Sequence, residues 1–140
     1  MGIDIHSAKS LTQDTPDKPH VFMVQGRYQN WIKPVMILEY LGIDWQPVVL
    51  SDPDSGTEWY GTIHPYKYLP AVIDSVDGER TVLWDSTTIL AYLAERYDPE
   101  KSLYGRTMKE RLEIQNWLIF ETANLGCVPV GRCIHGRSRR

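Results

Sequence analysis

Two short segments constrain the fold of this chain more than any other feature. The first is HPYKYLPAVID, residues 64–74, and the second is LWDSTTILAYL, residues 83–93. Leu69 and Pro70 lead directly into an apolar run that predicts a strand. A proline at the mouth of a strand fixes the local backbone and often follows a cis bond, so we expect a cis Leu69-Pro70 peptide.

The second segment predicts a helix that begins at Asp85 and Ser86. The first turn of a helix has free N–H groups that bind a carboxylate, and a strand edge offers its main chain to an extended peptide. Together the two segments suit a small peptide ligand. Ser86 has an alternative role as an ordinary N-cap, which satisfies the same N–H groups without any ligand.

In combination, the segments resemble the glutathione site of the glutathione transferase superfamily. That family carries roughly Asn-Pro-x-x-x-Val-Pro-Ala-Leu and then Glu-Ser-x-x-Ile-x-x-Tyr-Leu. His64, Leu69 and Asp85 replace the Asn, Val and Glu of this pattern. The resemblance implies that Leu69 and Pro70 bind the cysteinyl part of glutathione, whereas Asp85 and Ser86 bind the γ-glutamyl part.

The remaining elements predict an α/β fold. Apolar runs and helical spacing indicate the following order: a strand over 20–25, a helix over 29–41, strands over 45–50, 70–74 and 81–84, and a helix over 86–97. Pro47 restricts its strand to a sheet edge. This order predicts a thioredoxin-like domain over residues 20–98, with a mixed four-stranded sheet flanked by helices. Residues 1–19 are polar and predict a flexible leader.

Residues 107–125 have helical spacing and are similar to the first helix of the all-α second domain of this superfamily. They resemble most a fungal branch that includes the yeast nitrogen regulator. Members of the family continue through several further helices, so the resemblance implies that residues 105–140 are the start of a truncated C-terminal domain.

Transferases of this kind activate the thiol of glutathione. A thiol with a pKa near 8.5 is only about 3% ionised at pH 7. One hydrogen bond to the thiolate lowers this pKa enough to ionise most of the thiol. The resemblance to the fungal branch implies that Asn30 is the catalytic donor. Asn30 has an alternative role as a helix cap, and Tyr28 is a second candidate donor.

The net charge of −3 gives no indication of a nucleic-acid or membrane partner. The N-terminus has no continuous apolar stretch, so we expect a cytoplasmic protein. Cys127, Cys133 and His135 lack the usual spacing of a zinc site, so we expect no metal. We expect no cofactor other than glutathione as co-substrate, and a second copy of the chain is a candidate partner.

The resemblance therefore implies a glutathione S-transferase-like enzyme that conjugates the thiolate of glutathione to an electrophilic small molecule. The electrophile would be a xenobiotic or an intermediate of fungal secondary metabolism. The alternative is a non-catalytic module of the same fold that binds glutathione, dimerises or regulates, with its activity impaired by truncation.

Overall fold

A computed structural model describes residues 5–10, 12–24 and 29–125 of the chain. Within these ranges four strands form one mixed sheet in the order β2-β1-β3-β4. The strands are β1 (His20–Val24), β2 (Gln46–Leu50), β3 (Ala71–Val76) and β4 (Glu79–Trp84). β1 pairs in parallel with β2 and antiparallel with β3, and β3 pairs antiparallel with β4. The predicted α/β class with a mixed four-stranded sheet is confirmed.

Local sequence explains the position of each strand. β1 lies inside the sheet, and all five of its residues are buried. β2 lies at an edge, where the missing N–H of Pro47 removes no interior hydrogen bond. β3 and β4 are joined by Asp77 and Gly78, which both have positive φ angles, as a tight hairpin turn requires. The two strands are longer than predicted because pairing continues to Val76 and Glu79 beside the turn.

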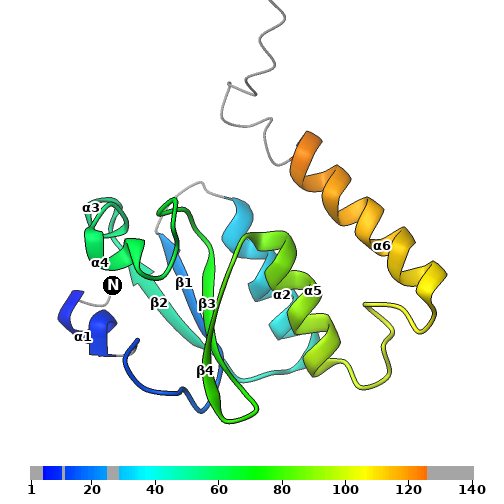
Figure 1. The fold of residues 1–140 in the computed structure, drawn as a ribbon, viewed down its shortest axis with the longest axis horizontal. Helices are drawn as coiled ribbons and strands as arrows, with labels where there is room; N and C mark the ends of the chain where they lie inside the picture. The colour runs from blue at the N-terminus through cyan, green and yellow to red at the C-terminus, as the bar shows by residue number, and fades with distance from the viewer. Residues whose placement is uncertain (1–4, 11, 25–28, 126–140) are drawn as a thin grey trace, which may run out of the picture.

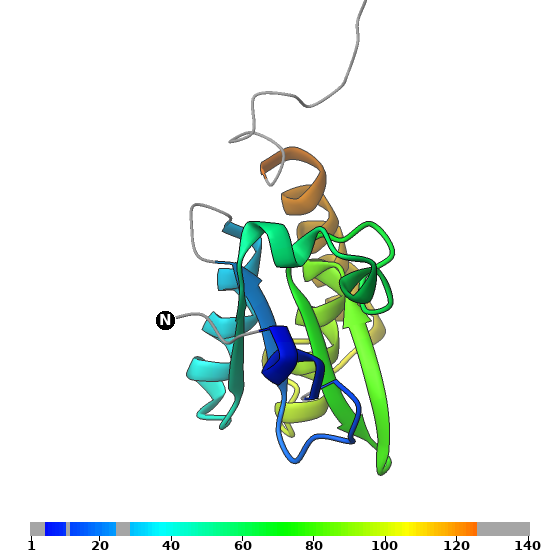
Figure 2. The same cartoon turned by 90° about the vertical axis from the view of Figure 1, so that its left-hand side faces the viewer.

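Helices cover both faces of the sheet (Figures 1 and 2). On one face lie α2 (Ile32–Leu41) and α5 (Ser86–Tyr97), and on the other lie α1 (Ile5–Ser10), α3 (Asp52–Ser55) and α4 (Glu58–Gly61). Alternate strand residues enter the two cores, as the pleat of a strand dictates. Val21 and Val72 pack with α2 and α5, whereas Phe22 and Ile73 pack with Tyr60 of α4.

The structure corrects the prediction of a flexible leader for residues 5–10. These residues form α1, and Ala8 is fully buried in the same cluster as Phe22 and Tyr60. The segment has little apolar periodicity, so the sequence pattern did not indicate this helix. Thr12 then donates a hydrogen bond from its hydroxyl to the carbonyl of Lys9, 2.7 Å away, and so closes the end of the helix.

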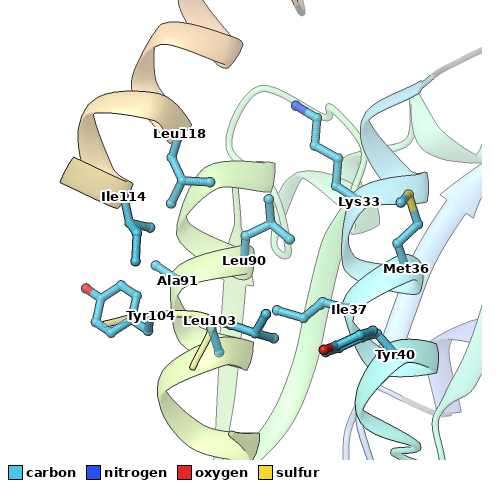
Figure 3. A pocket seen from close by; sticks show the side chains of 11 residues that line it. Lys33, Met36, Ile37, Tyr40, Leu90, Ala91, Leu103, Tyr104, Ile114 and Leu118 are labelled. Carbon is cyan, nitrogen blue, oxygen red and sulfur yellow. The ribbon is translucent and has the colours of Figure 1, made fainter. Parts of the chain in front are cut away.

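The helix predicted after the α/β unit is present as α6 (Met108–Phe120), followed by a π-helical turn, η2 (Glu121–Leu125). A capping box between Thr107 and Glu110 starts α6. The body of α6 stands away from α5, and a groove of about 420 Å³ separates α6 from α2 and α5. Ile114 and Leu118 point into this groove (Figure 3).

A buried carboxylate fixes α5 on the sheet. Asp74, at the fourth position of β3, is 2% exposed and accepts hydrogen bonds from the hydroxyls of Tyr92 and Tyr97, each at 2.7 Å. Burial and the bond to Asp74 raise the pKa of both tyrosines, so both phenols remain protonated donors at neutral pH. Because Tyr92 and Tyr97 both belong to α5, the two bonds set where this helix lies along β3.

This clamp predicts a measurable effect on stability. Hydrogen bonds to a charged group contribute about 1.5–3 kcal/mol each, so Tyr92→Phe and Tyr97→Phe should each lower the free energy of unfolding by about that amount. Urea unfolding measures the change. Tyr40→Phe is the matched control, because Tyr40 is exposed on α2 and should change the stability by less than about 0.5 kcal/mol. A Tyr92→Phe variant as stable as the control would contradict the clamp.

Candidate functional site

One cleft brings together all five residues that the sequence selects. It has a volume of about 270 Å³ and lies between η1 (Gln29–Trp31), the loop before β3 and the start of α5. Its lining includes the predicted site residues Asn30, Leu69, Pro70, Asp85 and Ser86. These residues come from three separate segments, so the fold rather than the local sequence makes them neighbours. Their individual roles remain predictions.

The Leu69-Pro70 bond is cis, as predicted. Tyr60 of α4 holds the loop before β3 in place, because its hydroxyl donates a hydrogen bond to the carbonyl of Tyr68 at 2.9 Å. Tyr60 is fully buried, and burial raises the pKa of its phenol, so it remains a donor. β3 begins at Ala71, directly after the cis bond, and Leu69 lines the cleft at the mouth of the strand.

His64 performs a structural task in the same loop. It is 4% exposed, and its Nδ1 accepts a hydrogen bond from the backbone N–H of Tyr66 at 3.2 Å. Burial lowers the pKa of His64, while the charge of Asp85 acts in the opposite direction. A neutral imidazole therefore accepts this bond. An asparagine, which the family pattern has at this position, also carries a short side-chain acceptor, so the replacement preserves the turn.

Asp85 and Ser86 have different structural roles at the start of α5. Asp85 is the N-cap, because its carboxylate accepts from the N–H of Thr87 at 2.9 Å. Its φ of 70° is uncommon for a residue with a side chain, and such conformations cluster at functional sites. The N-cap interpretation of Ser86 is therefore wrong. Ser86 is the first helical residue, is buried, and lines the cleft.

Asn30 is half-buried in η1 and lines the same cleft as the start of α5. The N-cap of α2 is Trp31, which makes no side-chain capping bond, so capping of α2 does not account for Asn30. The second candidate donor, Tyr28, lies outside the described residues. The same holds for Cys127, Cys133 and His135, which the sequence analysis considered for a metal.

Several residues of the cleft were not among the predicted site residues. Tyr66, Tyr68 and Trp84 are exposed and form an aromatic group with His64 at its rim. Thr122 of η2 also lines the cleft, and its hydroxyl contacts that of Thr87. No local pattern identifies Thr122, because it is remote from the two motifs in the sequence. The three aromatic residues lie within the two motif segments, so the number of aromatic side chains in these segments is the sequence feature that could have indicated them.

Neither metal ligands nor membrane spans are found in the part of the chain that the structure describes. No group of three or more histidine, cysteine, aspartate or glutamate side chains there could hold a metal ion. Likewise, none of the helices described above is long and apolar enough to cross a membrane.

Comparison with known proteins identifies the class to which this fold and cleft belong. Residues 32–96 match the family described as "Glutathione S-transferase, N-terminal domain". The chain is thus similar to glutathione S-transferases over this segment. It is 48% identical over 126 residues to glutathione S-transferase verG of Clonostachys rogersoniana, covering 90% of this chain and 53% of that relative. The chain thus spans about half the length of this curated relative.

Two further matches extend this result. The trimodular acetylaranotin synthesis protein ataIMG of Aspergillus terreus is 37% identical over 102 residues, covering 71% of this chain and 11% of that protein. A glutathione transferase from Burkholderia graminis, solved with two glutathione molecules per subunit, superposes with a TM-score of 0.72 at 25% identity. That match covers 88% of this chain and 52% of the solved chain. The predicted thioredoxin-like fold is confirmed.

The buried His64 predicts a pH dependence of stability. Its pKa is lowered in the folded state, so the unfolded chain binds the proton more readily near pH 6.5 and below. The contribution of neutral His64 is therefore complete above about pH 6.5 and is lost as the pH falls below that value. Between about pH 7.5 and 5.5 we expect the free energy of unfolding to fall less in His64→Asn than in the unaltered chain. Urea unfolding at both pH values measures it, and an identical pH dependence in the two proteins would contradict the prediction.

Proposed function

We propose that this cleft binds glutathione and that the protein transfers the glutathione thiolate to an electrophilic small molecule. The observation that supports this proposal best is the single cleft shared by Asn30, Leu69, Pro70, Asp85 and Ser86. Three kinds of group meet there: the main chain at the mouth of a strand, the N-terminus of a twelve-residue helix, and a side-chain amide. These groups complement the backbone, the γ-glutamyl carboxylate and the thiol of one tripeptide.

In this proposal the γ-glutamyl end lies at the start of α5. Its α-carboxylate accepts hydrogen bonds from the hydroxyl and N–H of Ser86, and the helix dipole adds about 0.3–1 kcal/mol. The exposed carboxylate of Asp85 pairs with the α-amino group. The cysteinyl residue then extends toward Leu69, whose main chain binds it as a neighbouring strand would. This orientation directs the thiol toward Asn30.

Asn30 would supply the chemistry by donating a hydrogen bond from its side-chain amide to the sulfur. Lowering a thiol pKa by two units requires about 2.7 kcal/mol, and one hydrogen bond to a charged acceptor supplies about 1.5–3 kcal/mol. The thiolate then attacks the electrophilic carbon and forms a C–S bond. The electron pair of the breaking bond leaves with the leaving group or, in an addition, remains on the substrate.

The name of one relative supports a proposal for the class of electrophile. Because one relative is named for acetylaranotin synthesis, an intermediate of fungal secondary metabolism is the favoured substrate class, with xenobiotics as the other class. We place the protein in the cytoplasm, where glutathione is plentiful. The non-catalytic alternative keeps the same cleft and differs only in lacking turnover, so the thiol pKa and the turnover of the unaltered chain separate the two alternatives.

Ser86→Ala should weaken glutathione binding while leaving the fold nearly unchanged. Losing one hydrogen bond to the carboxylate should raise Kd by about 10- to 150-fold. The loss of stability should be smaller than the roughly 1 kcal/mol typical of a lost cap, because Asp85 rather than Ser86 caps α5. Titration calorimetry measures the affinity, with Thr88→Ala as an exposed control on the same helical turn. Equal affinities in both variants would remove Ser86 from the site.

Asn30→Ala should preserve glutathione binding and reduce its reactivity. Without the donor, the pKa of the bound thiol should return toward 8.5, which lowers the thiolate fraction at pH 7 by up to about thirtyfold. Ultraviolet titration of the bound thiolate and turnover of a generic aryl halide measure the two effects. If the unaltered chain binds glutathione but neither lowers its thiol pKa nor turns over, the non-catalytic alternative holds.

A further inference from the structure

Lys33 connects three elements at the start of α5. It belongs to α2, its side chain is 18% exposed, and its ammonium donates to the Oγ of Ser86 at 3.4 Å. The same ammonium forms an ion pair with the carboxylate of Glu121 in η2. Figure 3 shows Lys33 extending from α2 at one end of the groove. A cation is therefore held in contact with the serine hydroxyl that lines the cleft.

The direction of the bond from Lys33 determines what Ser86 can do. An ammonium only donates, so Ser86 is the acceptor, and its single hydroxyl proton remains for another acceptor. Because Ser86 lines the cleft, a carboxylate there is the acceptor that this proton suits. The positive charge of Lys33 behind the hydroxyl strengthens such a bond.

The charges around Ser86 also differ on its two sides. Asp85, the preceding residue, presents a carboxylate at the rim of the same cleft. Lys33 approaches from α2 and is held there by Glu121. A cation and an anion on either side of a hydroxyl complement the α-carboxylate and α-amino group of one amino-acid end.

We propose that Lys33 is a positioning and specificity-determining residue that makes the cleft select ligands with a free α-carboxylate at the γ-glutamyl end. This inference rests on the proposed function, because it concerns the same cleft and the same ligand. Lys33 acts through Ser86, and Glu121 holds the ammonium in place. The π-helical turn η2 thereby contributes to the site, and such helical irregularities are frequent at functional sites.

The test compares three ligands in titration calorimetry with the 140-residue chain. The ligands are glutathione, its analogue 4-aminobutyryl-cysteinyl-glycine, which lacks the α-carboxylate, and glutaryl-cysteinyl-glycine, which keeps that carboxylate and lacks the amino group. Lys33→Met should weaken glutathione and the glutaryl analogue by about 10- to 100-fold. It should change the affinity for the 4-aminobutyryl analogue by less than about twofold, because the group that Lys33 helps to bind is absent.

Two variants complete the experiment. Lys33→Arg keeps the charge and should restore most of the discrimination between glutathione and the 4-aminobutyryl analogue. Lys109→Met removes an equal charge from an exposed position on α6 and should leave all three affinities unchanged. If Lys33→Met weakens all three ligands equally, Lys33 only maintains the structure and the inference is wrong. If the unaltered chain binds none of the ligands, the proposed function fails instead.

Discussion

The bonds from two tyrosines of α5 to the buried carboxylate of Asp74 determine where α5, and with it one wall of the cleft, lies on the sheet. A helix packed only by apolar side chains is free to adopt several nearly equivalent positions on a sheet. A buried carboxylate restricts the helix to one position, because a shift of the helix would separate the carboxylate from its hydrogen-bond donors at a large cost in free energy. Asp74 belongs to the strand that begins beside Pro70, so one strand carries both the cis-proline loop and the anchor of α5.

That arrangement explains how the cleft forms. The clamp fixes the C-terminal half of α5, and β4 leads through Trp84 into its first turn. The positive φ of Asp85 makes the abrupt change of direction between strand and helix, and the cap that its carboxylate provides holds this conformation. The loop before β3 is held separately by Tyr60 and His64. Two independently supported walls therefore line one cleft together with Asn30.

The sequence predicted the elements that are encoded locally, and the cleft through a resemblance. The helix at 86–97, the cis bond at Pro70 and the edge position of β2 all depend on a few adjacent residues. Contacts between remote segments could not be predicted in this way. The burial of Ala8, the contact of Lys33 with Ser86 and the contribution of Thr122 depend on the assembled fold. Capping was misassigned because Asp85 and Ser86 are both good N-cap residues, and only the backbone geometry distinguishes them.

The central claim is that one tripeptide occupies the space between Leu69 and the start of α5. Amide chemical shifts of the isotope-labelled chain, followed by NMR during a glutathione titration, test this claim most directly. The account predicts that the largest changes occur at the amides of Leu69, Ser86 and Thr87 and that they saturate together. Largest changes in the groove between α5 and α6, or no saturable change at Leu69 and Ser86, would contradict it.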